Sequence, residues 1–265
     1  MMMISGITAL QATRYLQQHP SHLFSIPYYF LRGYYSFEMQ NENYKCNPMM
    51  INFWNMFAEG RWEKDLIEYL HNYLNSDSVF LDVGAWIGPT VLYAAKRCKT
   101  VYCFEPNKRT FKTLENNIKL NGLRNVVPIN AALSDKSGQM IFSRFGDDST
   151  FSALNPSNEG EIVDVIGWSD WINAQEIDFI KTDIEGGEFS LIPSMKTYLM
   201  DHKPIVHLST HCQYLDTKKR ASEMQKIVDT LKIYDNCFNK HGKPIHINSL
   251  LDDSVLNAPR AFLFR

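Results

Sequence analysis

Acidic residues stand at the ends of three apolar segments of this 265-residue sequence. Asp82 follows VFL, and Glu105 follows VYCF, 23 residues further along the chain. Asp183 and Glu185 come after IDFIKT, and their spacing places both side chains on one side of an extended backbone. Carboxylates of this kind accept hydrogen bonds from ligand hydroxyls, bind metal ions, orient an ammonium group or act as general bases. We therefore expect a polar ligand site built from these acids.

A glycine-containing turn, DVGAWIG, follows the first of these segments. Gly84 and Gly88 allow the backbone to approach a ligand closely, and the helix that follows offers unpaired N–H groups. Three occupants are considered: a phosphate, the adenosine end of a cofactor, or no ligand. A dinucleotide site requires G-x-G-x-x-G, but Trp86 stands where the middle glycine belongs. Asp82 repels a phosphate and suits an ammonium group, so a pyrophosphate is the less favoured occupant.

Glu105 is positioned to accept hydrogen bonds from ribose hydroxyls, as acids at the end of a second strand do. The alternative is a surface acid that caps the following helix. A further segment, IVHLSTH, carries His207 and His211. We expect His207 to act as the base or to orient an acceptor, with Asp183 helping to place the substrate hydroxyl. The alternatives are a structural histidine and a divalent metal held by the two acids at 183 and 185 with one of these histidines.

The elements that position these residues alternate along the chain. Helical spacing or capping predicts helices at 62–74, from Pro89 onward, at 107–122 and at 222–235, and apolar composition predicts strands at 78–83, 101–104, 125–133, 177–183, 204–210 and 261–265. The stretch from SGQMIFSR to EIVDVIGW predicts a hairpin-like insertion. Alternating strands and helices predict an α/β fold, with a mainly parallel sheet and helices on both faces. Ligands bind such sheets at the carboxyl ends of the strands, where the acids stand.

The composition limits the class of protein. A net charge of −2 and a pI near 6.4 give no basic field for a nucleic-acid partner. The five cysteines are scattered without a CxxC pair, which argues against disulfides and structural zinc and suits the cytoplasm. The N-terminus has no basic stretch typical of a signal peptide, and no apolar run approaches about 20 residues.

Residues 1–60 are predicted to form an aromatic-rich N-terminal extension to a domain at 61–265. This extension holds twelve aromatic and only six charged residues. We expect its aromatic side chains to pack on the main domain. An acceptor-site lid, a homodimer face and a membrane-surface contact stay open as alternatives.

Four ordered motifs together resemble the FkbM-type family of S-adenosylmethionine-dependent methyltransferases: LDVGAWIGPT, FEPNKRTFKTLENNIKLNGL, NAALSDKSG and IDFIKTDIEGGE, with a fainter similarity at AEGRWE. The resemblance covers about residues 79–192. It implies a Rossmann-like class I methyltransferase fold and methylation of a hydroxyl oxygen on a sugar, glycan or natural product. Two positions depart from the family pattern. Trp86 stands where relatives commonly have Asn, and the histidines of IVHLSTH stand where many have an acid.

The resemblance also implies roles for single residues. The methionine part of the cofactor is assigned to Asp82, Gly84 and Gly88, the ribose to Glu105, the adenine edge to Asn130 and Ala131, and the surroundings of the transferred methyl to Asp183 and Glu185. A divalent metal is not favoured.

We therefore expect an S-adenosylmethionine-dependent O-methyltransferase with a small-molecule or glycan acceptor. A methyltransferase for nucleic-acid base amines is expected to carry an Asn/Asp-Pro-Pro-aromatic turn, and this chain has Asp183-Ile-Glu-Gly instead. Two alternatives remain. A noncatalytic Rossmann-like interaction module has no need of acids at three strand ends, and a nicotinamide oxidoreductase shares Glu105 but needs the missing glycine.

Overall fold

The structure is a computed structural model that describes residues 25–145, 150–152, 160–173 and 175–265. The chain divides into two compact units, Met1–Arg61 and Trp62–Arg265. Residues 1–24, where the sequence predicts no signal peptide, lie outside the described part. All five cysteines are buried as free thiols.

The first unit contains a β-hairpin and short helices. Its elements are α2 (Ser25–Arg32), β1 (Tyr35–Met39), β2 (Glu42–Cys46), the 3-10 helix η2 (Pro48–Met50) and α3 (Ile51–Ala58). The hairpin turns at Gln40 and Asn41, whose φ angles are 51° and 62°. Phe37 stacks on Tyr44 and Trp54, with ring centroids 5.3 and 5.8 Å apart. The aromatic residues of this unit therefore form a cluster of their own.

The second unit is built on an eight-stranded sheet with the order β13-β12-β14-β11-β10-β3-β4-β5. Its strands are β3 (Val79–Val83), β4 (Thr100–Phe104), β5 (Val126–Ile129), β10 (Phe179–Thr182), β11 (Ile205–Thr210), β12 (Cys237–Asn239), β13 (Pro244–Ile245) and β14 (Arg260–Phe264). The five strands from β11 to β5 are parallel, whereas β14, β12 and β13 pair antiparallel. The predicted α/β architecture with a mainly parallel sheet is confirmed.

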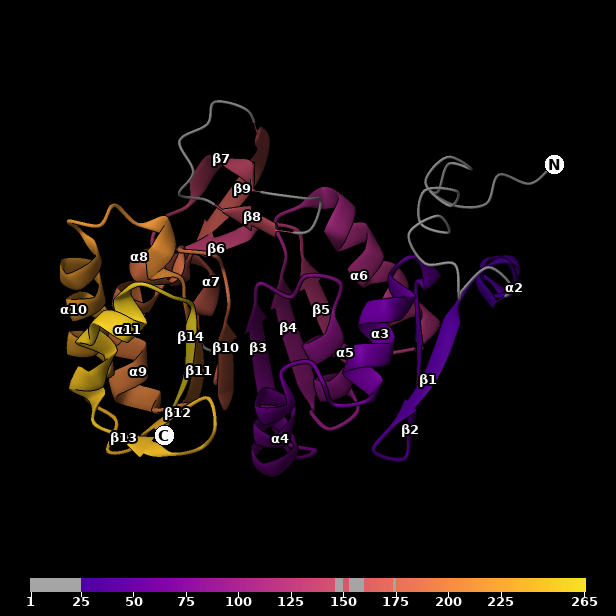
Figure 1. Ribbon diagram of the computed structural model, residues 1–265, viewed down its shortest axis with the longest axis horizontal. Coiled ribbons are helices and arrows are strands. Elements are labelled where there is room, and N and C mark those ends of the chain that lie inside the picture. The colour runs from indigo at the N-terminus through magenta and orange to yellow at the C-terminus, as the bar shows by residue number, and fades with distance from the viewer. Residues whose placement is uncertain (1–24, 146–149, 153–159, 174) are drawn as a thin grey trace. The chain divides into compact units, whose positions relative to one another are not determined.

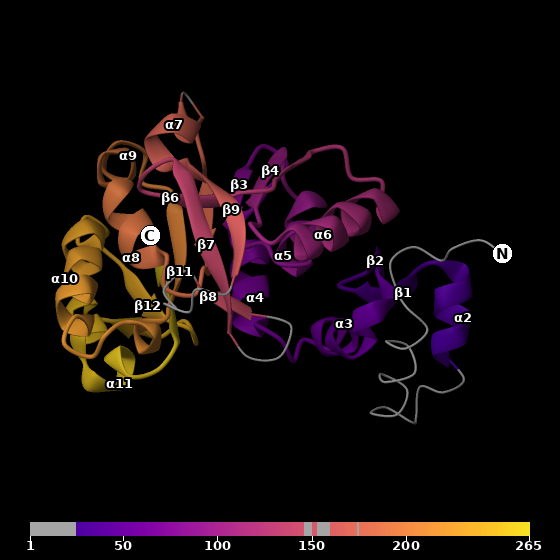
Figure 2. The same ribbon diagram turned by 90° about the horizontal axis from the view of Figure 1, so that it is seen from above.

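Helices lie on both sides of this sheet (Figures 1 and 2). They are α4 (Lys64–Tyr73), α5 (Pro89–Ala95), α6 (Lys108–Leu120), α7 (Trp168–Ile172), α8 (Glu188–Ser194), α9 (Lys196–His202), η3 (Cys212–Tyr214), α10 (Arg220–Leu231), η4 (Ile247–Leu251) and α11 (Asp253–Leu256). The predicted helical starts have clear causes. Pro89 occupies the first turn of α5, where its missing N–H costs nothing, and the Asn107 side chain caps α6 by accepting from the Thr110 N–H.

A smaller four-stranded sheet forms the predicted insertion. Its order is β6-β9-β7-β8, from β6 (Ala132–Ser134), β7 (Gly138–Phe145), β8 (Thr150–Ser152) and β9 (Gly160–Gly167). The strand predicted at 125–133 is in fact two strands, because the chain leaves the main sheet after Ile129 and enters the second sheet at Ala132. The Asn130 side chain holds this crossing by donating to the backbone carbonyls of Glu105 and Pro106.

The order of the main sheet brings the predicted acids to one edge. From β3 the chain builds β4 and β5 on one side, and later β10 and β11 on the other. Because strand order changes direction at β3, the connections on its two sides run apart at the carboxyl edge of the sheet. Ligands bind at this position in folds of this kind. Asp82 lies opposite Lys181 across the β3–β10 pair, and His207 lies opposite Lys181 across the β10–β11 pair. Among the described residues, no helix is long and apolar enough to cross a membrane.

Candidate active site

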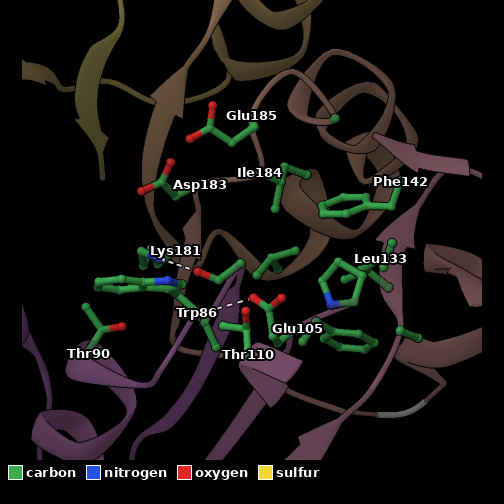
Figure 3. A pocket seen from close by; sticks show the side chains of 18 of the residues that line it. Trp86, Thr90, Glu105, Thr110, Leu133, Phe142, Lys181, Asp183, Ile184 and Glu185 are labelled. Carbon is green, nitrogen blue, oxygen red and sulfur yellow. Dashed lines mark hydrogen bonds between the residues drawn. The ribbon is translucent and has the colours of Figure 1, made fainter. Parts of the chain in front are cut away.

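A cavity of about 350 Å³ lies at the carboxyl edge of the main sheet (Figure 3). Its floor is formed by the residues that follow β3, β4 and β10, and β6 and β7 supply one wall. Four acidic side chains from three places in the chain line it: Glu63, Glu105, Asp183 and Glu185. Lys181 is the cationic side chain among its described lining residues. The cavity is therefore acidic.

The glycine turn adopts the left-handed backbone that its composition allows. Gly84 and Gly88 have φ angles of 87° and 92°, and Trp86 between them has a φ of 51°. A Cβ atom on Gly84 would lie 1.9 Å from the Asp183 carbonyl oxygen, and one on Gly88 would lie 2.5 Å from the Leu114 side chain. Contact with neighbouring protein atoms therefore accounts for both glycines. Gly84 also lines the cavity, and Gly88 is outside its lining set.

Asp82 is completely buried and is engaged by protein groups. Its Oδ1 lies 3.0 Å from the Lys181 ammonium, and its Oδ2 accepts a hydrogen bond from the Thr90 hydroxyl. Burial disfavours a charged lysine, but the Asp82 carboxylate and then the Asp183 carboxylate raise the pKa of Lys181 above its usual value. Asp82 was expected to suit an ammonium group, and in the structure it pairs with the ammonium group of Lys181. Lys181 was not among the predicted site residues, although a lysine inside an apolar strand is itself a sign of a buried acidic partner.

Glu105 lies at the cavity with only 7% of its surface exposed. Its Oε2 accepts from the Trp86 N–H at 3.0 Å, and its Oε1 accepts from the Asn107 N–H at 2.9 Å. Burial raises the pKa of Glu105 to about 7, although these backbone donors lower it. Each carboxylate oxygen retains capacity for another donor, which a ligand hydroxyl can supply. The capping alternative also holds in part, because the Asn107 N–H precedes α6.

Of the two residues assigned to the adenine edge, Ala131 lines the cavity and Asn130 is outside its lining set. Ala131 is joined there by the apolar side chains of Phe104, Leu133 and Phe142. The Asn130 amide is engaged by the backbone carbonyls at the crossing between the sheets. The cavity therefore has an acidic side and an apolar side.

Asp183 and Glu185 both line the cavity and lie close together in Figure 3. The Nε2 atom of His211 lies 3.6 Å from Asp183 Oδ1, and its Nδ1 lies 3.4 Å from Oε1 of the buried Glu188. Burial lowers the pKa of His211, but Glu188, then Asp183 and Glu185, raise it to about 9. His211 is therefore protonated at neutral pH, so it balances the charge of the acids and is not a proton acceptor.

His207 lies inside β11 rather than at its end, and it is outside the cavity's lining set. It is 3% exposed, and its ring centroid is 6.3 Å from that of Tyr69. Burial and then the charge of Lys181 lower the pKa of His207 to about 4, so its ring is neutral at physiological pH. Among the described residues, its Nδ1 has no hydrogen-bond partner. The ring is thus in the proton-accepting form, but His207 does not line the cavity, whereas Lys181 opposite it on the neighbouring strand does.

Glu63 lines the cavity and was not among the predicted site residues. It precedes α4 in a left-handed conformation, with a φ of 38°. Burial and then the Asp183 charge raise the pKa of Glu63 to about 7. The faint family similarity at AEGRWE, which ends at this residue, is the sequence feature that could have identified it.

The alternative metal site draws on Asp183, Glu185, His207 and His211. Across the described ranges, no group of three or more His, Cys, Asp or Glu side chains is arranged to hold a metal ion. His211 reaches Asp183, whereas His207 lies near Tyr69. The described residues therefore do not assemble the alternative metal site of the two acids with one histidine.

Comparison with known proteins gives a family and several relatives. The family model described as "Methyltransferase FkbM domain" matches residues 82–241, more than half of the chain. The tRNA (guanine(37)-N(1))-methyltransferase Trm5b of Pyrococcus abyssi is 30% identical over 95 residues, which are 34% of this chain and 29% of that protein.

Two solved structures are among those that match this chain. An FkbM methyltransferase from Methylobacillus flagellatus KT matches with a TM-score of 0.48 and 18% identity over 75% of this chain and 50% of that one. TYW2 from M. jannaschii, solved with AdoMet, matches with a TM-score of 0.42 and 13% identity over 88% and 84% of the two chains. This chain thus spans half or less of the length of the FkbM structure and of Trm5b. The family match over residues 82–241, together with the parallel sheet, shows that the chain has a Rossmann-like class I methyltransferase fold and belongs to the FkbM methyltransferase family.

Proposed function

We propose that this protein is an S-adenosylmethionine-dependent O-methyltransferase that acts on a hydroxyl group of an uncharged sugar, glycan or natural product. Its membership of a methyltransferase family supports the reaction class. The observation that carries the cofactor assignment is the cavity at the carboxyl edge, where a buried carboxylate on Glu105 faces an apolar wall. Such a pair of surfaces suits a ribose joined to an adenine ring.

The residues present fit this cofactor. Glu105 would accept from the ribose hydroxyls, Ala131 and its apolar neighbours would contact the adenine, and the Gly84 backbone would face the methionine part. S-adenosylmethionine supplies a methyl group made electrophilic by a sulfonium charge, and the acidic lining complements that charge. The assignments of Asp82, Gly88 and Asn130 to the cofactor stay predictions, since protein atoms already contact these residues.

The charge of the cavity limits the acceptor. Four carboxylates line it, and its lysine is paired with Asp82. A phosphorylated or carboxylated acceptor would be repelled, whereas a neutral polyol would find hydrogen-bond acceptors at Asp183 and Glu185. We propose that Asp183, beside the protonated His211, orients the acceptor hydroxyl. We also propose that His207 accepts the proton of the acceptor hydroxyl. Because His207 does not line the cavity, the proton would pass to it through an intervening group.

A transfer RNA acceptor is the rival function, because Trm5b acts on guanine in tRNA and shares 30% identity with 95 residues of this chain. The acidic cavity and a net charge of −2 argue against it, since RNA binding depends on basic residues that contact phosphates. Methyl transfer is common to both functions, so the acceptor must be tested directly.

The test begins with calorimetric titration of the full chain with S-adenosylmethionine and with NAD. Transfer of a radiolabelled methyl group is then measured to a neutral glycoside, to the matching sugar phosphate and to transcribed tRNA. We expect S-adenosylmethionine to bind and NAD not to bind. We expect methyl transfer to the neutral glycoside and none to the sugar phosphate or the tRNA. Transfer to tRNA would replace the proposed acceptor class, and binding of NAD alone would overturn the reaction class.

Replacing Glu105 tests the ribose assignment. We expect Glu105→Ala to weaken S-adenosylmethionine binding by about 1–3 kcal/mol, because the ribose hydroxyls lose their acceptor. Glu115→Ala, on the exposed face of α6, is the matched control and should bind as the unaltered protein does. Unchanged affinity in Glu105→Ala, measured by the same titration, would exclude Glu105 as the ribose partner.

A further inference from the structure

Glu63 lines the cavity, and one of its carboxylate oxygens is enclosed without a hydrogen-bond donor among the described residues. The Oε2 atom is enclosed, and among the described residues no hydrogen-bond donor reaches it. A buried carboxylate oxygen left in this state is unfavourable, because burial removes the water that would otherwise donate to it. Since Glu63 lines the cavity, a ligand there can supply the missing donor.

The other acids of the cavity already have partners. Glu105 accepts from the backbone N–H groups of Trp86 and Asn107. Glu185 is hydrogen-bonded to Tyr214, and Asp183 faces the protonated His211. Glu63 therefore differs from the other acidic residues that line the cavity, because one of its oxygens is enclosed and has no donor among the described residues.

We propose that Glu63 recognises a primary ammonium group of the bound ligand, which under the proposed function is the α-ammonium of S-adenosylmethionine. The sequence assigned this task to Asp82, but Lys181 and Thr90 occupy both oxygens of that carboxylate. A sulfonium carries positive charge without an N–H group, so it cannot satisfy the enclosed Oε2. An ammonium group supplies both the charge and the donor.

The electrostatics of Glu63 give this proposal a second consequence. The pKa of Glu63 is raised to about 7, first by burial and then by Asp183, while Lys181 and His211 lower it and Asp82 raises it. Part of the Glu63 population is therefore protonated at pH 7 in the ligand-free protein. An ammonium group at Oε2 stabilises the ionised carboxylate, so binding at pH 7 should release a proton.

The experiment compares two thioethers that differ in the amino-acid part. S-adenosylhomocysteine carries the ammonium group without a sulfonium charge, and 5′-methylthioadenosine lacks the amino-acid part altogether. Their affinities are measured by calorimetry for the unaltered protein, for Glu63→Gln and for the control Glu68→Gln, whose residue is exposed on α4. We expect Glu63→Gln to bind S-adenosylhomocysteine roughly 10- to 100-fold more weakly, since a charged hydrogen bond is lost, and to bind methylthioadenosine unchanged.

Each other outcome has a distinct meaning. Equal weakening for both thioethers would show a structural role for Glu63 and overturn the proposal. Unchanged S-adenosylhomocysteine affinity would also overturn it, and if methyl transfer were then lost, Glu63 would be a proton acceptor for the substrate hydroxyl. If S-adenosylhomocysteine failed to bind the unaltered protein, the proposed function itself would fail. Proton release by the unaltered protein, measured at pH 7 in two buffers of different ionisation enthalpy, needs no variant. Its absence would contradict the proposal.

Discussion

At the scale of single residues, Lys181 and Asp82 form the central ion pair of the second unit. Both are almost completely buried, at 4% and 0% exposure, and the Lys181 ammonium also donates to the Gly84 carbonyl at 3.0 Å. We expect Lys181→Met to lower the free energy of unfolding by about 3–5 kcal/mol, because it leaves the Asp82 carboxylate buried without its counterion. Urea denaturation followed by circular dichroism measures the change.

The double variant Asp82→Asn with Lys181→Met is the control for this ion pair. It removes both charges, so it should recover part of the stability lost by Lys181→Met alone. A double variant that is less stable than the single one would show that Asp82 does not depend on Lys181 for its charge balance.

His207 should make the protein sensitive to acid. Its pKa is about 4 in the folded protein against about 6.5 in an unfolded chain, so the native ring is neutral. Its stabilising contribution is complete above pH 6.5 and is lost as the pH falls towards 4, where only the unfolded state gains the proton. We expect the unaltered protein to lose about 3 kcal/mol more stability than His207→Gln between pH 7 and pH 4.

Denaturation curves of both proteins across that pH range test this expectation, since the other groups titrate in both. Parallel loss of stability would mean that the native ring is protonated. Methyl transfer by His207→Gln at pH 7.5 tests the separate prediction that His207 takes part in catalysis, and normal turnover would exclude it.

The sequence could predict that Glu105, Asp183 and the Gly84 turn approach one another, because the carboxyl ends of neighbouring parallel strands share an edge. It could not predict the partner of Asp82. That partner depends on which strand lies beside β3, and spacing along the chain does not determine the strand order. Glu63 was missed for a related reason, since it precedes a helix whose approach to the cavity is set by tertiary packing.

At the scale of elements, long segments with one clear period were predicted well, and short ones were not. The helix predicted at 107–122 is α6, whose buried face carries Leu114 and Ile118. The strands β12 and β13 were missed because they have three and two residues, too few to show a period. The predicted strand at 125–133 gave no indication that it divides between two sheets, since both halves are apolar.

The turn between β3 and α5 gives a prediction about backbone strain. Trp86 has a φ of 51°, a conformation that costs an L-residue about 1–2 kcal/mol and glycine little. We expect Trp86→Gly to be more stable than Trp86→Ala by about 1 kcal/mol, although glycine normally weakens a fold. Both variants lose the indole, so thermal unfolding of the pair isolates the backbone contribution. An alanine variant as stable as the glycine variant would show that the turn relaxes.

At the scale of the whole molecule, the division into two units separates two kinds of core. The first unit buries Phe37, Tyr44 and Trp54 against one another. The second unit buries a mainly aliphatic core, with aromatic members such as Phe104 and Trp168, between a mainly parallel sheet and its helices. The sequence predicts an extension up to residue 60 because aromatic residues are dense and charged residues sparse there. It could not say which function the first unit has, since aromatic density is common to lids, interfaces and cores.

The lining of the cavity leads to a prediction about that first unit. Among the described residues, those that line the cavity come from Trp62 onward, so the cavity belongs to the second unit. A shortened chain that begins at Gly60 should therefore bind S-adenosylmethionine with an affinity close to that of the full chain, measured by calorimetry.

If the predicted lid role of residues 24–37 holds, methyl transfer by the shortened chain should fall steeply, because water then reaches the acceptor side. Full transfer by the shortened chain would exclude the lid, and liposome cosedimentation that disappears on shortening would favour membrane-surface contact instead. Loss of cofactor binding in a shortened chain that still unfolds cooperatively would show that the first unit contributes to the site itself.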